Sequence, residues 1–162
     1  MIGGGDWGED RLLADAVRAV SASAPLRVRN PDAVRPWQHV LNPLSGYLLL
    51  AQECVRTAAA ARAWNFGPRA ADERPVSWIL ERLSEQWRGE LRWELDERAH
   101  PREARRLALD SSAAEAALGW TPRWDLAEAL ERVVDWHDDE RRGGDMRAAT
   151  LAQIRDFAAA GA

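Results

Sequence analysis

Residues 35–40, Arg35-Pro36-Trp37-Gln38-His39-Val40, form the segment around which the rest of this chain can be interpreted. A polar segment, Arg27-Val28-Arg29-Asn30-Pro31, precedes it, and an apolar run, Tyr47-Leu48-Leu49-Leu50, follows it. A guanidinium group is planar, permanently charged and forked, so an arginine between a proline turn and a helix suits two-point binding of a phosphate or diphosphate. Arg35 is therefore a candidate anion-binding residue. The alternative is an ion pair with a carboxylate such as Asp32, because surface ion pairs are common and contribute little.

Length and composition predict one globular domain. The chain has 162 residues, enough to bury one hydrophobic core and seldom two, so we expect a single domain over residues 1–162. Hydrophobic residues make up 46% of it and charged residues 30%, which is too apolar for a disordered chain. No apolar run reaches membrane-spanning length, and residues 1–6 lack the basic and apolar regions of a signal peptide. We expect a cytoplasmic protein with no membrane partner.

Charge, cysteine and histidine content exclude several classes of site. The net charge of −4 argues against a nucleic acid partner, because binding a phosphate backbone needs a concentrated basic face. Cys54 is the only cysteine, so no intrachain disulfide can form, and on a predicted helix it is expected to be a small buried side chain. His39, His100 and His137 lack the paired spacing of zinc sites, so no metal site is expected.

The chain lacks the side chains for lysine-dependent chemistry. All 22 basic residues are arginine, which excludes Schiff bases and phosphate-loop lysines. Tyr47 is the only tyrosine, and the residue four positions after it is Ala51. A tyrosine acts as a base at neutral pH only when a neighbouring cation lowers its pKa. We therefore expect no catalytic residue in this chain.

A glycine run near the start does not make a dinucleotide-binding loop. Such a loop needs a preceding strand and a helix that opens directly on the glycines. Only Met1 and Ile2 precede Gly3-Gly4-Gly5. The fingerprint is therefore absent, and no cofactor is expected for this chain alone.

The hydrophobic pattern predicts helices joined by short strands. Helices are predicted at 10–20, 41–61, 77–87 with Ser77 as N-cap, 110–118 with Gly119 as its stop, from Asp125 as N-cap to Gly143, and from Thr150. Strands are predicted at 26–29, 63–66 and 91–95, the first forming a two-stranded ribbon with the extended segment that leads to Arg35. The residues predicted to face a core are Leu44, Tyr47, Leu48, Ala51 and Val55 in the helix 41–61. In the helix 10–20 they are Leu12, Leu13, Ala16, Val17 and Val20, and in the helix that begins at Asp125 they are Leu126, Leu130, Val133, Val134 and His137. Since no long apolar strand is present, the fold class is a helix-rich α/β unit without a full sheet of its own.

Six ordered motifs carry a resemblance to a known family: Ile2-Gly3-Gly4-Gly5-Asp6-Trp7, Asp10-Arg11-Leu12, Arg35-Pro36-Trp37-Gln38-His39-Val40, Pro43-Leu44-Ser45-Gly46-Tyr47-Leu48, Trp64-Asn65-Phe66-Gly67-Pro68 and Leu118-Gly119-Trp120-Thr121-Pro122. Together they resemble the C-terminal portion of the CDP-glucose 4,6-dehydratases, which are extended, Rossmann-type short-chain dehydrogenases/reductases of the NAD-dependent epimerase/dehydratase family. The resemblance covers nearly the whole chain. It implies a nucleotide-sugar-binding part whose N-terminal dinucleotide-binding half is absent. Family members commonly have valine in place of Met1, so we expect a truncated gene model or a gene remnant.

The resemblance also implies which residues bind substrate. Arg35, assisted by Arg11, would neutralise the diphosphate of a CDP-sugar. Asn30 would shape the base pocket, and His100 and Glu103 would hold the ribose. The alternative for Arg11 is a solvent-exposed side chain, and for His100 and Glu103 it is a solvated loop.

In the whole enzyme that the resemblance implies, NAD oxidises C4 of CDP-glucose, water leaves across C5 and C6, and hydride returns to C6. This portion would bind the CDP group, while the absent portion carries out the redox step; Ile2 and Gly3 would line the edge of the cofactor. The chain would then be inactive alone. Two alternatives stay open: a noncatalytic interaction module, and a subunit that complements a separately encoded N-terminal half.

Overall fold

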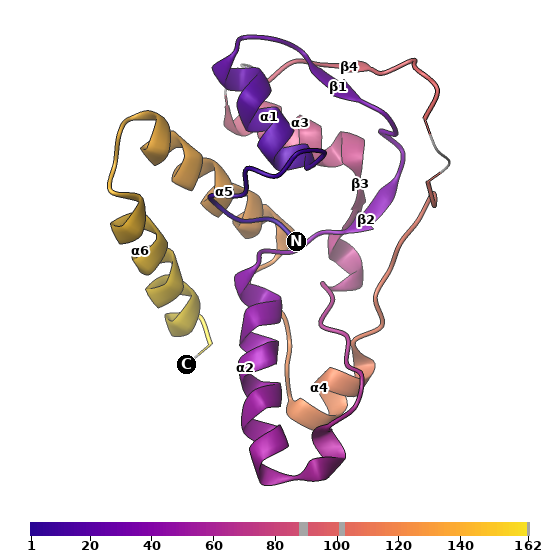
Figure 1. Cartoon of the computed structure of the whole chain (residues 1–162), viewed down its shortest axis with the longest axis vertical. Coiled ribbons are helices and arrows are strands. Elements are labelled where there is room, and N and C mark those ends of the chain that lie inside the picture. The colour runs from indigo at the N-terminus through magenta and orange to yellow at the C-terminus, as the bar shows by residue number, and fades with distance from the viewer. Residues whose placement is uncertain (88–90, 101–102, 162) are drawn as a thin grey trace.

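The computed structural model describes residues 1–87, 91–100 and 103–161, so Pro101 and Arg102 of the predicted ribose-binding loop lie outside the described residues. Short strands alternate with longer helices along the chain (Figure 1). The elements are α1 (Leu12–Ser21), β1 (Leu26–Val28), β2 (Val34–Pro36), α2 (Leu41–Arg56), the 3-10 helices η1 (Ala58–Ala60) and η2 (Ala70–Asp72), β3 (Glu73–Pro75), α3 (Val76–Gln86), β4 (Trp93–Leu95), α4 (Ser112–Leu118), α5 (Leu126–Arg141) and α6 (Met146–Ala159).

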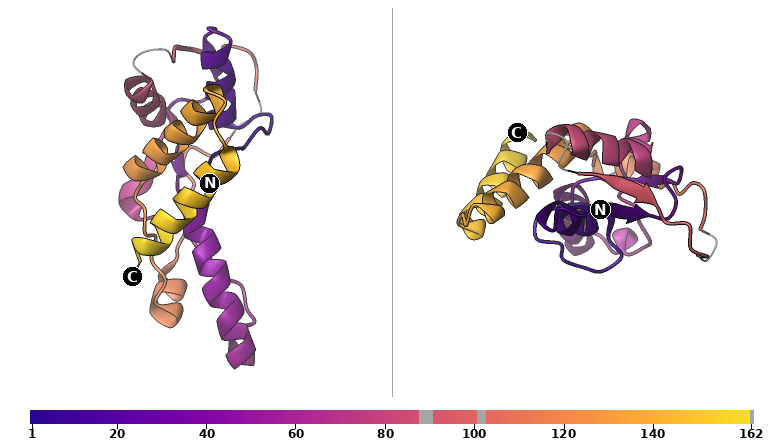
Figure 2. Two further views of the ribbon diagram at one scale, coloured as in Figure 1. Left: turned by 90° about the vertical axis from the view of Figure 1, so that its left-hand side faces the viewer. Right: turned by 90° about the horizontal axis from the view of Figure 1, so that it is seen from above.

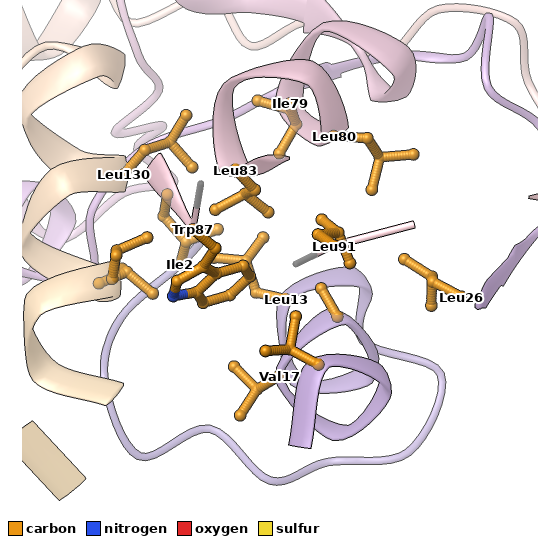
Figure 3. Close-up of a cluster of buried hydrophobic side chains, with 14 of the residues drawn as sticks. Ile2, Leu13, Val17, Leu26, Ile79, Leu80, Leu83, Trp87, Leu91 and Leu130 are labelled. Carbon is orange, nitrogen blue, oxygen red and sulfur yellow. The ribbon is translucent and has the colours of Figure 1, made fainter. Parts of the chain in front are cut away.

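The main core lies between α1, α3 and α5 (Figure 3). Leu13 and Val17 of α1 meet Ile79, Leu80 and Leu83 of α3, whose side chains are completely buried. The predicted inward stripe of α5 is confirmed, because all its members are buried: Leu126, Leu130, Val133, Val134 and His137. Burying a large aliphatic side chain contributes about 1.5–3 kcal/mol, so this cluster is a main source of stability.

The strands form two separate pairs, and the predicted ribbon is wrong. β1 pairs with β4 in parallel, while β2 pairs with β3 antiparallel. Leu26 and Val28 are buried in the main core, so β1 must lie over α1 and α3 rather than beside β2. A turn closed by the N–H of Ala33 on the carbonyl of Asn30 separates the two strands.

The predicted strand at 63–66 is also absent from the structure. Phe66 is buried, but the polar groups of this segment bond to side chains. The Gln38 side-chain amide donates to the Phe66 carbonyl at 2.6 Å, and the Gly67 N–H donates to Ser111 Oγ at 2.6 Å. Side-chain partners therefore satisfy an extended backbone that the sequence pattern assigns to a sheet.

The start of the chain pairs with the segment that leads into α2. Ile2 and His39 form a parallel bridge, in which the Ile2 N–H donates to the Gln38 carbonyl at 2.9 Å and the Val40 N–H donates to the Ile2 carbonyl at 2.8 Å. The helix α2 begins directly after this bridge, at Leu41.

The helix α2 extends beyond the rest of the molecule, with α4 beside it (Figures 1 and 2). Its inward side carries Asn42, Pro43 and Gly46, and the ring of Phe66 lies against Gly46. The stripe predicted to face a core is exposed instead: Leu44 (43%), Tyr47 (50%), Leu48 (69%), Ala51 and Val55 (88%). The prediction found an amphipathic helix correctly, but the described residues leave most of its apolar face uncovered, although the ring of Tyr47 packs on Phe66.

Two helix ends have the capping residues that the sequence predicts, and two helix starts differ from the prediction. Asp125 caps α5 as predicted, accepting from the Glu128 N–H at 2.9 Å, and α4 ends at Gly119, whose φ is +63°. Ser77 does not cap α3, because its N–H bonds to the carbonyl of Pro31 and the helix begins at Val76. The last helix begins at Met146, four residues before the predicted start, with Asp145 as its cap.

Candidate functional site

A cavity of about 320 Å³ lies beside β1 and the turn that follows it. Apolar side chains line part of its wall, and charged side chains line the rest. The lining residues are Asp10, Leu12, Asp15, Leu26, Arg27, Val28, Arg29, Asn30, Ala33, Arg35, Val76, Asp96, Arg98, His100 and Glu103. They come from the start of α1, from β1 and β2 with the turn between them, from the start of α3 and from the segment after β4.

Arg35 is held at the cavity by both strand pairing and its own hydrogen bonds. It lies in the middle of β2, opposite Arg74 of β3. Its guanidinium donates to the carbonyls of Val34 and Ala104, both at 2.9 Å, and to Glu103 Oε2 at 2.8 Å. The ion-pair partner is therefore Glu103, which also lines the cavity, rather than Asp32. Because only 19% of the side chain is exposed, the charge is held in one place at the wall.

Four of the five predicted substrate-binding residues line this cavity: Asn30, Arg35, His100 and Glu103. Asn30 sits in the turn after β1, and His100 and Glu103 come from a segment about 70 positions later in the sequence. The fold thus brings together residues that the sequence leaves far apart.

The structure does not bring Arg11 to this cavity. Arg11 is the exposed N-cap of α1, and its side chain lies against Gly8, while its neighbours Asp10 and Leu12 line the cavity. The stripe of α1 explains this placement, because Leu12 and Leu13 turn toward the protein and Arg11 must then turn outward.

Asp96 and Arg98 are cavity residues that the sequence reasoning missed. Only 3% of the Asp96 side chain is exposed, and its carboxylate accepts from the guanidinium of Arg98, with Nε to Oδ1 at 2.8 Å and an NH2 nitrogen to Oδ2 at 2.6 Å. These hydrogen bonds hold the pKa of Asp96 well below its usual range. The signal was an aspartate directly after the predicted strand 91–95, with Arg98 and His100 two and four positions later.

Opposite charges balance along the wall. Four arginines (Arg27, Arg29, Arg35 and Arg98) face four carboxylates (Asp10, Asp15, Asp96 and Glu103). A purely cationic wall would bind any anion, whereas here three of the four guanidinium groups pair with a lining carboxylate: Arg29 with Asp10, Arg35 with Glu103 and Arg98 with Asp96. The cavity can therefore offer fixed N–H donors to phosphate oxygens and carboxylate oxygens to hydroxyl groups.

The residues predicted to line a cofactor do not lie at this cavity. The Ile2 side chain is 4% exposed and packs in the main core (Figure 3). The glycine run serves packing, because Gly4 lies directly against the indole of Trp136, and α1 begins only at Leu12. A phosphate cradle needs glycine N–H groups at the start of a helix. The glycine run therefore forms no phosphate cradle, and the contact of Ile2 and Gly3 with the edge of NAD stays a prediction for the whole enzyme.

Neither a membrane-spanning helix nor a metal-binding cluster is found among the described residues. None of their helices combines the length and apolarity needed to cross a lipid bilayer. They also contain no cluster of three or more histidine, cysteine or acidic side chains arranged to hold a metal ion.

No family model matches the chain. Among curated proteins, CDP-glucose 4,6-dehydratase from Salmonella typhimurium is 44% identical over 161 residues. The match covers 99% of this chain but only 45% of that enzyme. The chain is similar throughout to the C-terminal portion of CDP-glucose 4,6-dehydratase. The resemblance carried by the six motifs is thus confirmed.

Two solved structures share the fold of this chain. UDP-glucuronic acid 4-epimerase from Bacillus cereus, in complex with UDP-glucuronic acid and NAD, superposes with a TM-score of 0.67 at 16% identity, over 80% of this chain and 40% of that one. RMD from Pseudomonas aeruginosa, complexed with NADPH, gives a TM-score of 0.68 at 24% identity, over 86% and 46%. The helix-rich α/β fold is confirmed, and the chain spans less than half the length of the proteins it matches.

Proposed function

We propose that this chain binds the nucleotide part of a nucleotide sugar, and that the ligand is a CDP-sugar. The observation that carries the proposal is the meeting of Arg35, Glu103, His100 and Asn30 around one cavity. The similarity to CDP-glucose 4,6-dehydratase supports cytidine as the base and a cytoplasmic setting for the protein.

The chemistry of each group suits one part of the ligand. The planar fork of Arg35 fits two oxygens of a diphosphate. Glu103 supplies carboxylate oxygens that can accept hydrogen bonds from ribose hydroxyls, and His100 lies three positions before it. Because Glu103 pairs with Arg35 at 2.8 Å, an arriving diphosphate would take over the guanidinium and release the carboxylate for the ribose.

The proposal extends to the whole enzyme. The redox step and the binding of NAD belong to the portion that this chain does not match, and the chain alone turns over no substrate. Binding energy from the CDP group would position the sugar for that chemistry.

Titration calorimetry with CDP tests the binding function. Arg35→Gln keeps a polar side chain but removes the charge and the guanidinium fork, and should weaken CDP binding by about tenfold or more. Arg62→Gln is the control, because Arg62 is exposed and stacks on Trp64 away from the cavity. Absence of CDP binding to the unmodified chain, or equal loss in both variants, would overturn the proposal.

A second function, complementation of a separate dinucleotide-binding half, is favoured by the exposed stripe of α2. Five consecutive positions of that stripe face solvent along the helix. The helix follows a parallel bridge, and helices that follow parallel strands normally cover the face of a parallel sheet. We infer that the partner surface is the sheet of a dinucleotide-binding half, and that the stripe buries itself there.

Coproduction with the N-terminal portion of the Salmonella typhimurium enzyme tests this assembly. A tagged copy of this chain should retain that portion. Leu48→Glu places a charge on the stripe and should abolish retention, whereas Gln52→Glu, at an exposed position outside the stripe, should keep it.

The single cysteine gives a second readout. Cys54 is exposed, contrary to the sequence expectation of a buried side chain, and its alkylation should slow in the complex. Capture that resists Leu48→Glu, or no capture, would refute this assembly. Capture of unrelated proteins alone would favour a noncatalytic module.

A further inference from the structure

The backbone of Asp96 is held in place by a hydrogen bond at the end of a strand pair. It directly follows β4, and its N–H donates to the carbonyl of Val28 at the end of β1, at 2.8 Å. The parallel pairing of β1 with β4 holds this position against the main core. A buried carboxylate at the end of a paired strand can therefore anchor flexible side chains that come after it.

Two side chains at the cavity reach back to this one carboxylate. Arg98 bonds to both oxygens through its guanidinium, and its backbone N–H donates to Oδ1 at 3.2 Å. His100 Nε2 lies 3.1 Å from Oδ2. Because the Arg98 hydrogen bonds also lower the pKa of Asp96, the carboxylate stays ionised and the anchor persists at neutral pH.

Arg35 and Arg98, two of the four arginines at the cavity, differ in how their N–H donors are used. Arg35 donates to two carbonyl oxygens and to Glu103, so its guanidinium is largely occupied. Arg98 uses the edge formed by Nε and NH2 on Asp96, and its side chain is 71% exposed. A guanidinium has five N–H groups, so Arg98 keeps donors for a further anion while its orientation is already set.

We propose that Arg98 is a second phosphate-binding residue of this cavity and that Asp96 is the positioning residue that acts through it. The inference rests on the proposed binding of a CDP-sugar and adds that the site selects a diphosphate over a monophosphate or a nucleoside. Two fixed guanidinium groups match the two phosphates of the ligand. Holding Arg98 in place before binding reduces the ordering that binding requires.

Affinities for cytidine, CMP and CDP, measured by titration calorimetry, test this inference. Arg98→Gln should weaken CDP by about tenfold, weaken CMP less and leave cytidine unchanged. Asp96→Asn should give the same dependence on phosphate number, and Asp96→Glu should restore part of the CDP affinity. In the double variant, Asp96→Asn should add little to Arg98→Gln, because Asp96 acts through Arg98.

The outcomes separate this inference from the proposed function. If the unmodified chain binds none of the three ligands, both are overturned. If Arg35→Gln weakens CDP but Arg98→Gln does not, only the role of Arg98 fails. If Asp96→Asn weakens cytidine as much as CDP, or its effect adds in full to Arg98→Gln, Asp96 is merely structural. Arg98→Gln alters an exposed side chain, so its result is readable even if Asp96→Asn unfolds.

Discussion

Asn42 is a buried polar residue whose side chain joins two parts of the fold. It has no exposed surface, its Nδ2 donates to the Trp124 carbonyl at 2.9 Å, and its Oδ1 accepts from the N–H groups of Arg123 and Trp124. Asn42→Ala leaves these buried groups without partners, so the free energy of unfolding should fall by about 2–4 kcal/mol. Urea denaturation measures the change.

Asn65 provides the matched control for this prediction. It is exposed and makes one side-chain hydrogen bond, to the Asp110 carbonyl at 3.2 Å. Water can replace that bond, so Asn65→Ala should lower the free energy of unfolding by less than about 1 kcal/mol. Equal losses in the two variants would show that burial of the Asn42 amide is not what matters.

His39 makes stability depend on pH. Burial lowers its pKa to about 4, and the charge of Arg132 adds to this effect. The unfolded chain has the ordinary histidine pKa of about 6.5, so it takes up the proton first as the pH falls. Stability is therefore complete above about pH 6.5 and declines toward pH 4, by up to about 3 kcal/mol from this residue.

Urea denaturation at pH 7 and at pH 4.5 measures this dependence. His39→Asn removes the titrating group, while its side-chain oxygen can take over the role of Nδ1, which accepts from the Leu41 N–H. The variant should lose less stability between the two pH values than the unmodified chain. An unchanged loss would assign the effect to other groups, such as His137, whose pKa burial also lowers.

At the scale of elements, the predicted N-cap of α5, Asp125, can be tested by substitution. Asp125→Ala removes the acceptor of the Glu128 N–H and should lower the free energy of unfolding by about 1 kcal/mol. Asp125→Asn keeps an oxygen at the same place and should lower it by only a few tenths of a kcal/mol. Thermal unfolding of both variants measures the difference, and similar midpoints would rule out the capping bond as the cause.

Helices were predicted well and their partners were not. Periodicity places α1 and α5 with the correct faces buried, because their partners belong to this chain. The same periodicity gives α2 an inward stripe that is exposed here, since an apolar face is a property of the helix but burial depends on a neighbouring surface. Strand pairing failed for a related reason, because β1 pairs with β4, about 65 residues away, and alternation carries no information on partners.

At the scale of the whole molecule, the family resemblance named four of the residues that line the cavity, and local chemistry named only Arg35 among them. Arg35 lies within a segment quoted for the resemblance, whereas Asn30, His100 and Glu103 lie outside those segments and were implied by the resemblance as a whole; the fold gathers all four at the cavity. Asp96 and Arg98 escaped because an isolated Asp-x-Arg in a loop is usually a solvated ion pair. Only the burial of the carboxylate distinguishes this pair, and burial is a property of the assembled fold.

The placement of Tyr47 predicts that the chain alone forms no product from CDP-glucose. Its ring packs edge-on against Phe66 on the projecting helix α2, and it does not belong to the residues that line the cavity. The residue one turn later is Ala51, so no lysine or arginine stands there to assist the phenol as a base. NMR of CDP-glucose incubated with NAD and the chain should show unreacted substrate, while the same preparation binds CDP. Product formation that persists in Tyr47→Phe would mean that another residue supplies the base, and product lost in that variant would place the chemistry on α2.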